Sequence, residues 1–152
     1  MRFIVPIAAL LIFSTSASPT RASSLDEKVF DQETIKALEA KVLQAQPREQ
    51  CFLYAELVHQ MTEVSLKNYA AGDVDKATGM LKEIQGFAHK IHLSVAENDK
   101  RLKNAEILLR HTAFRLNEML HSSSFEDRAL VEQTLAQVNQ AESEAMLQVF
   151  RK

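Results

Sequence analysis

Apolar residues recur at every third or fourth position along most of the chain, which is the period of an α-helix with one buried face. Five such segments follow one another, separated by short breaks that are polar or contain glycine or proline. In chain order their stripes are Ile35, Leu38, Val42 and Ala45; Tyr54, Leu57, Val58, Met61 and Val64; Val74, Ala77, Leu81, Ile84, Ala88, Ile91 and Val95; Leu102, Ala105, Leu109, Thr112, Leu116 and Met119; and Val131, Leu135, Val138, Ala145 and Val149. Each stripe must be covered by another helix, because an apolar face in water is unfavourable.

The breaks carry ordinary helix start and stop signals. Ser24 to Glu27 forms a capping box that predicts a first helix running to about Ala45. Pro47 suits the first turn of a second helix, which Gly72 ends. The triple serine before Phe125 supplies caps for the last helix.

The four helices that follow residue 47 have similar lengths and short connections. This combination favours an up-down-up-down arrangement. We therefore predict an all-α fold, an antiparallel four-helix bundle with an additional N-terminal helix packed on its outside.

The joint near residue 98 allows a second interpretation. The segments 74–97 and 99–121 keep one heptad register across the joint, so they could form one long helix over about 74–120 with shorter helices packed on it. The second apolar pair, Ile107 and Phe114, lies nearly opposite the main stripe of its helix. A helix that is apolar on two faces needs neighbours on two sides, which favours the bundle.

The first 22 residues resemble a secretory signal peptide. Arg2 precedes an apolar run from Phe3 to Phe13, and small residues follow up to Ala22. This order is typical of a leader, and the run is too short to span a bilayer. We expect cleavage after Ala22, a periplasmic or secreted protein, an N-terminal helix within 23–46 and a bundle domain over 47–152.

Composition narrows the classes of function. Removal of the leader with its two arginines changes the formal charge from −2 to −4, so we expect no nucleic-acid partner. The mature chain has no apolar run long enough to span a membrane. A single cysteine excludes a disulfide scaffold within one chain.

Two Glu-x-x-His motifs, Glu56–His59 and Glu118–His121, resemble half of a di-iron bundle site. Their glutamates point away from the apolar stripes, so solvated helix faces explain them better.

His89 and His92 share a helix face, but no third ligand lies level with them. We expect no metal site, no cofactor, no catalytic residues and no enzymatic activity.

One polar group falls inside a stripe. Glu142 lies among the apolar residues of the last helix, and counting from helix ends places it level with His92 and near Tyr54. Buried polar groups need hydrogen-bond partners. We therefore predict a Tyr54–His92–Glu142 network, which is either structural or a small-ligand or proton site.

The second apolar face offers an interaction surface. Ile107, His111 and Phe114 share one side of their helix, and Gly79 and Gly86 lie seven residues apart, away from the main stripe of theirs. Glycine in a helix costs about 1 kcal/mol relative to alanine, and close approach of another helix would offset that cost. We expect these five residues to contact a protein partner or a second copy.

Two stretches, QCFLYAELVHQMTE from Gln50 and NDKRLKNAEILLRHTAFRLNE from Asn98, resemble a family of uncharacterised exported all-helical bacterial proteins. The resemblance spans about two-thirds of the chain and implies export and a helical fold, but no activity and no site residues.

The sequence thus predicts an exported helical module that binds a protein partner or self-associates. The alternative is a periplasmic bundle that binds a small ligand or metal through His92 and its neighbours.

Overall fold

The computed structural model describes residues 31–94, without the side chains of residues 92–94, and residues 101–151. These residues form five α-helices and no strand. The helices are α1 (Gln32–Gln44), α2 (Pro47–Ala70), α3 (Val74–Ser94), α4 (Leu102–Ser122) and α5 (Phe125–Phe150). The predicted all-α fold is confirmed.

The helix ends follow local chemistry. Helix α1 begins at Gln32, later than the predicted start at Ser24, because Asp31 is extended and its carboxylate accepts a hydrogen bond from the backbone N–H of Thr34 at 2.8 Å. The predicted capping box at Ser24 lies outside the described residues. Pro47 occupies the first turn of α2 as predicted, and Gly72 ends that helix region with a φ of +85°. That backbone conformation favours glycine.

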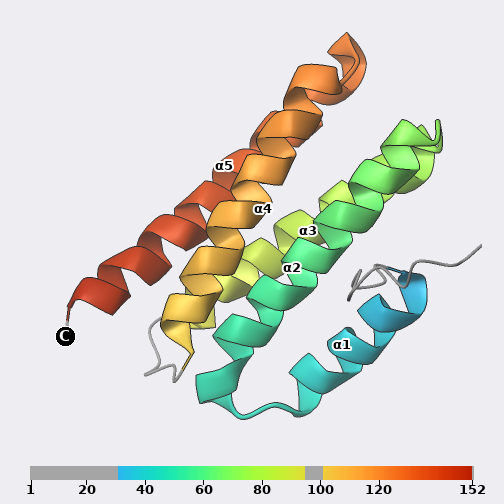
Figure 1. Ribbon diagram of the computed structural model, residues 1–152. Coiled ribbons are helices and arrows are strands. Elements are labelled where there is room, and N and C mark those ends of the chain that lie inside the picture. The colour runs from blue at the N-terminus through green and yellow to red at the C-terminus, as the bar shows by residue number, and fades with distance from the viewer. Residues whose placement is uncertain (1–30, 95–100, 152) are drawn as a thin grey trace, which may run out of the picture.

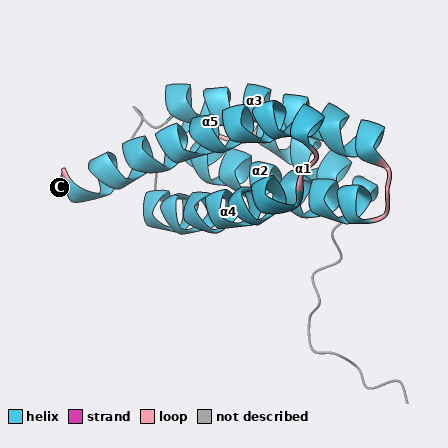
Figure 2. Ribbon diagram, turned by 90° about the horizontal axis from the view of Figure 1, so that it is seen from above, coloured by secondary structure: helices cyan, strands magenta, loops and turns pink. Residues whose placement is uncertain are grey.

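The bundle is built from two helical hairpins, one made of α2 and α3 and the other of α4 and α5 (Figure 1). The hairpins lie side by side, so that α2 packs on α4 and α3 packs on α5. Seen from above, α3 and α5 form one layer and α2 and α4 the other (Figure 2). Helix α1 packs on α2, outside the four-helix core. The predicted four-helix bundle with an additional N-terminal helix is therefore confirmed, with antiparallel packing within each hairpin and parallel packing between α2 and α4.

Contacts between α2 and α4 exclude the alternative of one long helix over residues 74–120. His59 lies beside Thr112, and Glu63 lies beside Arg115, so α4 runs next to α2 and in the same direction. A continuous helix would have carried α4 away from α2. Helices α3 and α4 instead occupy diagonal positions of the bundle, and residues 95–100 between them lie outside the described residues.

The predicted stripes form the core. All the stripe residues of α4, from Leu102 to Met119, are buried. Helix α2 is buried on more sides than its stripe predicts, including at Cys51, Ala55 and Thr62, because it contacts α1, α3 and α4. Within the described residues, the structure contains no helix with the length and hydrophobicity of a membrane span.

Candidate functional site

The outer face of α4 presents apolar side chains to solvent. We use the name outer face for the exposed side of α4 that carries Ile107, His111 and Phe114. Ile107 is 41% exposed and Phe114 is 61% exposed, and His111 is also exposed. The face is uncovered because α4 packs on α2 and α5 with its other sides, while α1 packs on α2. The structure therefore brings these three predicted residues together on one uncovered surface.

Other apolar side chains are exposed elsewhere. The exposed large apolar residues in the described part of the chain are Leu43, Ile107, Phe114, Phe125, Leu147 and Phe150. Leu43 and Phe125 are isolated on separate helices, and single exposed apolar residues are normal on protein surfaces. Leu147 and Phe150 lie in the last turn of α5. Ile107 and Phe114 differ from all of these because they occupy the middle of a helix.

The two candidate glycines lie on a different side of the molecule. Gly79 and Gly86 are exposed on α3, and a Cβ added to either would meet no atom within 4 Å. Gly79 borders a hollow of about 400 Å³ that Gln32 of α1 and Asn68 of α2 also line. Because α3 and α4 are diagonal in the bundle, the glycines and the outer face of α4 do not form one continuous surface.

The predicted Tyr54–His92–Glu142 network is only partly within the described structure. The Tyr54 ring lies 6.1 Å from the ring of Phe87, and the ammonium of Lys90 lies 5.8 Å from the Tyr54 ring. Tyr54 thus packs on α3, whereas Glu142 contacts α4 on the other side of the bundle. The His92 side chain lies outside the described residues, so the three-residue network stays a prediction.

Glu142 instead belongs to an acid pair between α4 and α5. Its carboxyl group lies close to that of Glu106, which is buried. Arg110 contacts both groups: its Nη2 bonds to Glu106, and its Nε lies 3.6 Å from Glu142 Oε1. Burial raises the pKa of Glu142, and the hydrogen bond to Glu106 and its negative charge raise it further, whereas Arg110 opposes the shift.

The sequence indicates one member of this acid pair, Glu142, but not the other. Glu142 interrupts an apolar stripe, which is a visible signal. Glu106 and Arg110 are one turn apart on α4, a spacing common for exposed ion pairs. Nothing in that spacing indicates that α5 covers the glutamate.

Within each layer, polar side chains near the middle of the bundle connect the two helices to each other. His59 Nδ1 lies 3.1 Å from Thr112 Oγ1 between α2 and α4. Gln85 Nε2 donates to Thr134 Oγ1 at 2.9 Å between α3 and α5. Both threonines are fully buried, and each also donates to a carbonyl oxygen one turn earlier in its helix. These bonds satisfy polar groups in the core and fix the alignment of the parallel helix pairs.

Arg115 forms a charged link between α2 and α4. Its Nε and Nη2 donate to the two carboxylate oxygens of Glu63 at 2.7 and 3.0 Å, and its Nη1 bonds to Glu118. The two carboxylates raise the pKa of the Arg115 guanidinium further above its usual value. This planar two-point contact is the geometry in which arginine binds carboxylates best. It ties the outer face of α4 to the bundle.

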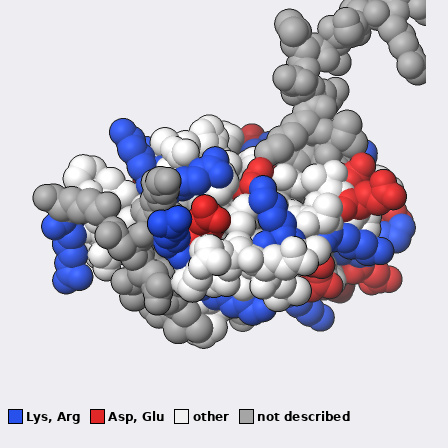
Figure 3. All heavy atoms as spheres, turned by 90° about the horizontal axis from the view of Figure 1, so that it is seen from below, with Lys and Arg blue, Asp and Glu red and all other residues white. Residues whose placement is uncertain are grey.

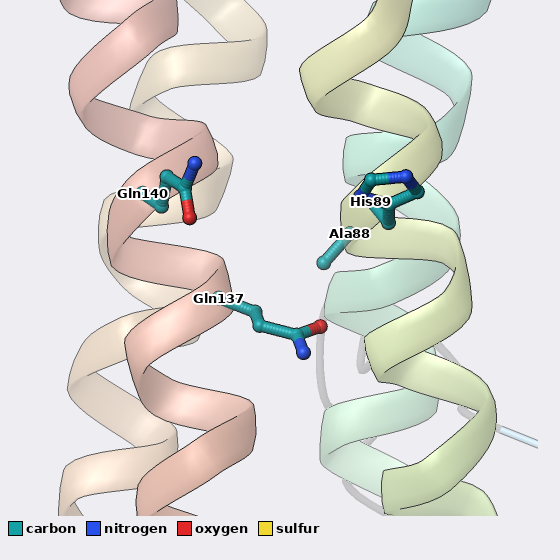
Figure 4. Close-up of a pocket in the computed structure, with 4 residues that line it drawn as sticks. All are labelled: Ala88, His89, Gln137 and Gln140. Atoms are coloured by element: carbon teal, nitrogen blue, oxygen red, sulfur yellow. The ribbon is translucent and has the colours of Figure 1, made fainter.

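A small pocket lies between α3 and α5 (Figure 4). Ala88, His89, Gln137 and Gln140 line it, and its volume is about 110 Å³. The Gln137 side chain extends from α5 toward α3, and its Oε1 atom is buried without a hydrogen-bond partner in the described structure. Ligand sites are usually about 300–1,000 Å³, so this space fits a few water molecules better than an organic ligand.

Charged side chains of both signs are interspersed on the face seen from below (Figure 3). This mixture differs from the broad basic surface typical of nucleic-acid binding. Among the described residues, no group of three or more histidine, cysteine, aspartate or glutamate side chains is placed to hold a metal ion.

Comparisons with known proteins gave no relative: no protein-family model, no curated protein and no solved structure matches this chain. The resemblance to exported bacterial proteins therefore stays an expectation.

Proposed function

We propose that this protein is an exported, non-enzymatic helical module that binds a protein through the outer face of α4. The observation that carries the proposal is the exposure of Ile107 and Phe114 in the middle of α4, where neither α1 nor the other helices cover them. Aromatic side chains with polar neighbours are typical anchors of protein interfaces. Arg115 and Thr112 hold the same helix rigidly on α2, so the face is presented in a fixed geometry.

The binding test places a photoreactive phenylalanine analogue at position 114 of the full chain, in the cell that produces it. We expect discrete cross-linked products whose masses identify the bound protein. Phe125 is the matched control, because it is also an exposed phenylalanine (93%) but lies at the start of α5, away from the outer face. Absence of products at position 114, or identical products at both positions, would contradict the proposal.

Export is tested separately. The proposed leader, residues 1–22, predicts a mature chain that begins at Ser23. N-terminal sequencing of protein recovered outside the cytoplasm checks this start. An intact Met1 terminus on the whole population would show that the leader is not removed.

A further inference from the structure

The outer face of α4 is charged at both ends. Lys103 lies near the start of the helix and Glu118 near its end, and both are exposed; Glu118 also accepts a hydrogen bond from Arg115 of the same chain through Oε2. Ile107 and Phe114 lie between them, and Arg110 and His111 occupy the middle. At 100° per residue these four side chains fall within one stripe of the helix surface together with Lys103 and Glu118.

This stripe is complementary to itself when reversed. Lys103 and Glu118 are equally far from the midpoint between Arg110 and His111, and so are Ile107 and Phe114. If a second α4 lies antiparallel on the first, each lysine therefore faces a glutamate and each isoleucine faces a phenylalanine. A two-fold axis at the midpoint generates both copies of each pair, as in the commonest kind of protein dimer.

The parallel arrangement lacks this match. It would place Lys103 beside Lys103 of the second copy and Glu118 beside Glu118 of the second copy. Like charges in contact are unfavourable and suppress that mode of association. The charge order along α4 thus selects one direction.

The middle of the stripe is also compatible with the antiparallel arrangement. There Arg110 faces His111 of the second copy. Both carboxyl groups of the acid pair, Glu106 and Glu142, contact the Arg110 guanidinium from within the same chain. Their negative charge offsets that of Arg110, so the imidazole meets no uncompensated cation.

We infer that the protein bound by the outer face is a second copy of this chain, with the two α4 helices antiparallel about a two-fold axis between Arg110 and His111. The inference rests on the proposed function and adds the partner and its register. Contact confined to one helix face belongs to the class of small, reversible interfaces. The dimer should therefore form at high protein concentration and weaken as salt screens the Lys103–Glu118 contacts.

The experiment is a charge swap followed by sedimentation equilibrium over a range of protein concentrations. Lys103→Glu and Glu118→Lys each convert two attractive contacts per dimer into repulsive ones, so each should raise the dissociation constant roughly ten-fold. The double variant restores opposite charges and should recover most of the affinity. Lys82→Glu is the control, because Lys82 is exposed on α3, diagonal to α4. Circular dichroism of each variant checks that it is folded.

The outcomes separate the register from the proposed function. Dimers that Phe114→Ser abolishes but the double charge variant does not recover would overturn the antiparallel register and leave the face as the binding surface. A monomeric wild-type chain that cross-links from position 114 to a different protein would overturn the second copy as partner. A dimer unaffected by Phe114→Ser would contradict both proposals.

Discussion

Glu106 of α4 and Glu142 of α5 face each other inside the bundle, and one guanidinium, that of Arg110, contacts both carboxyl groups. Two carboxylates that share one cation in a partly buried position repel each other when both are ionised. Protonation of Glu142 converts the repulsion into a hydrogen bond. The interface between α4 and α5 therefore contains a group whose charge opposes folding at neutral pH.

Glu142→Gln should increase the free energy of unfolding at pH values above the folded-state pKa of Glu142. Because the folded-state pKa of Glu142 lies above the ordinary value of 4.5, the folded chain binds more protons than the unfolded chain between those two values. The free energy of unfolding of the wild type thus falls as pH rises through that window. The glutamine variant lacks this loss, since its amide can donate to Glu106 without a proton from solvent.

Denaturant unfolding of wild type and Glu142→Gln over a series of pH values tests this. The two curves should coincide at the acidic end and separate in favour of the variant above the window. Glu132→Gln, an exposed position on the same helix, should follow the wild type. A variant that is less stable than the wild type near neutral pH would show that ionised Glu142 stabilises the interface.

Leu109→Ala should cost about 2–5 kcal/mol of unfolding free energy, because Leu109 is fully buried in the α4 stripe and its removal leaves a cavity. Leu43→Ala should change stability by less than about 0.5 kcal/mol, since Leu43 is 79% exposed on α1. Chemical denaturation measures both. Equal effects at the two positions would be incompatible with the core described above.

The contact between Arg115 and Glu63 should be worth about 1 kcal/mol in a double-mutant cycle. That value is at the upper end for exposed pairs, because the arginine donates to both carboxylate oxygens and the glutamate is largely buried. The Lys76–Asp73 pair has one contact at 3.1 Å between two exposed side chains, so its coupling should be at most a few tenths of a kcal/mol. A coupling energy near zero for both pairs would show that the contact of Arg115 with Glu63 does not stabilise the packing of α4 on α2.

Alanine substitution should lower the stability of the protein at Gly72 and raise it at Gly79 and Gly86. Gly72→Ala should destabilise by about 1 kcal/mol or more, because its φ of +85° is unfavourable for residues with a Cβ. Gly79→Ala and Gly86→Ala should each stabilise by up to about 1 kcal/mol, since both lie within α3 with open space around the added carbon. Thermal unfolding of the monomer measures all three. Destabilisation by Gly79→Ala or Gly86→Ala would indicate a close contact that the described residues do not contain.

The sequence predicted where many of the site residues lie on their helices, but not which side chains of other helices they contact. The apolar spacing of Ile107 and Phe114 marks a second face on their helix, and the structure leaves both exposed. The contacts of Glu142 with Glu106 and Arg110 could not be predicted, because they join helices whose pairing the sequence does not specify. The same holds for Arg115 and Glu63, which are far apart in the chain.

The sequence by itself determined that there are five helical segments and indicated one buried face for each, although α2 is buried on more sides than its stripe predicts. Spacing of three and four residues, Pro47 and Gly72 are local signals, and the stripe of α4 from Leu102 to Met119 is buried throughout. Only the tertiary structure decided which helices are neighbours, with α4 beside α2 and diagonal to α3. The physical reason is that hydrophobic burial is non-directional: a stripe of leucine, alanine and valine must be covered, but any other such stripe can cover it.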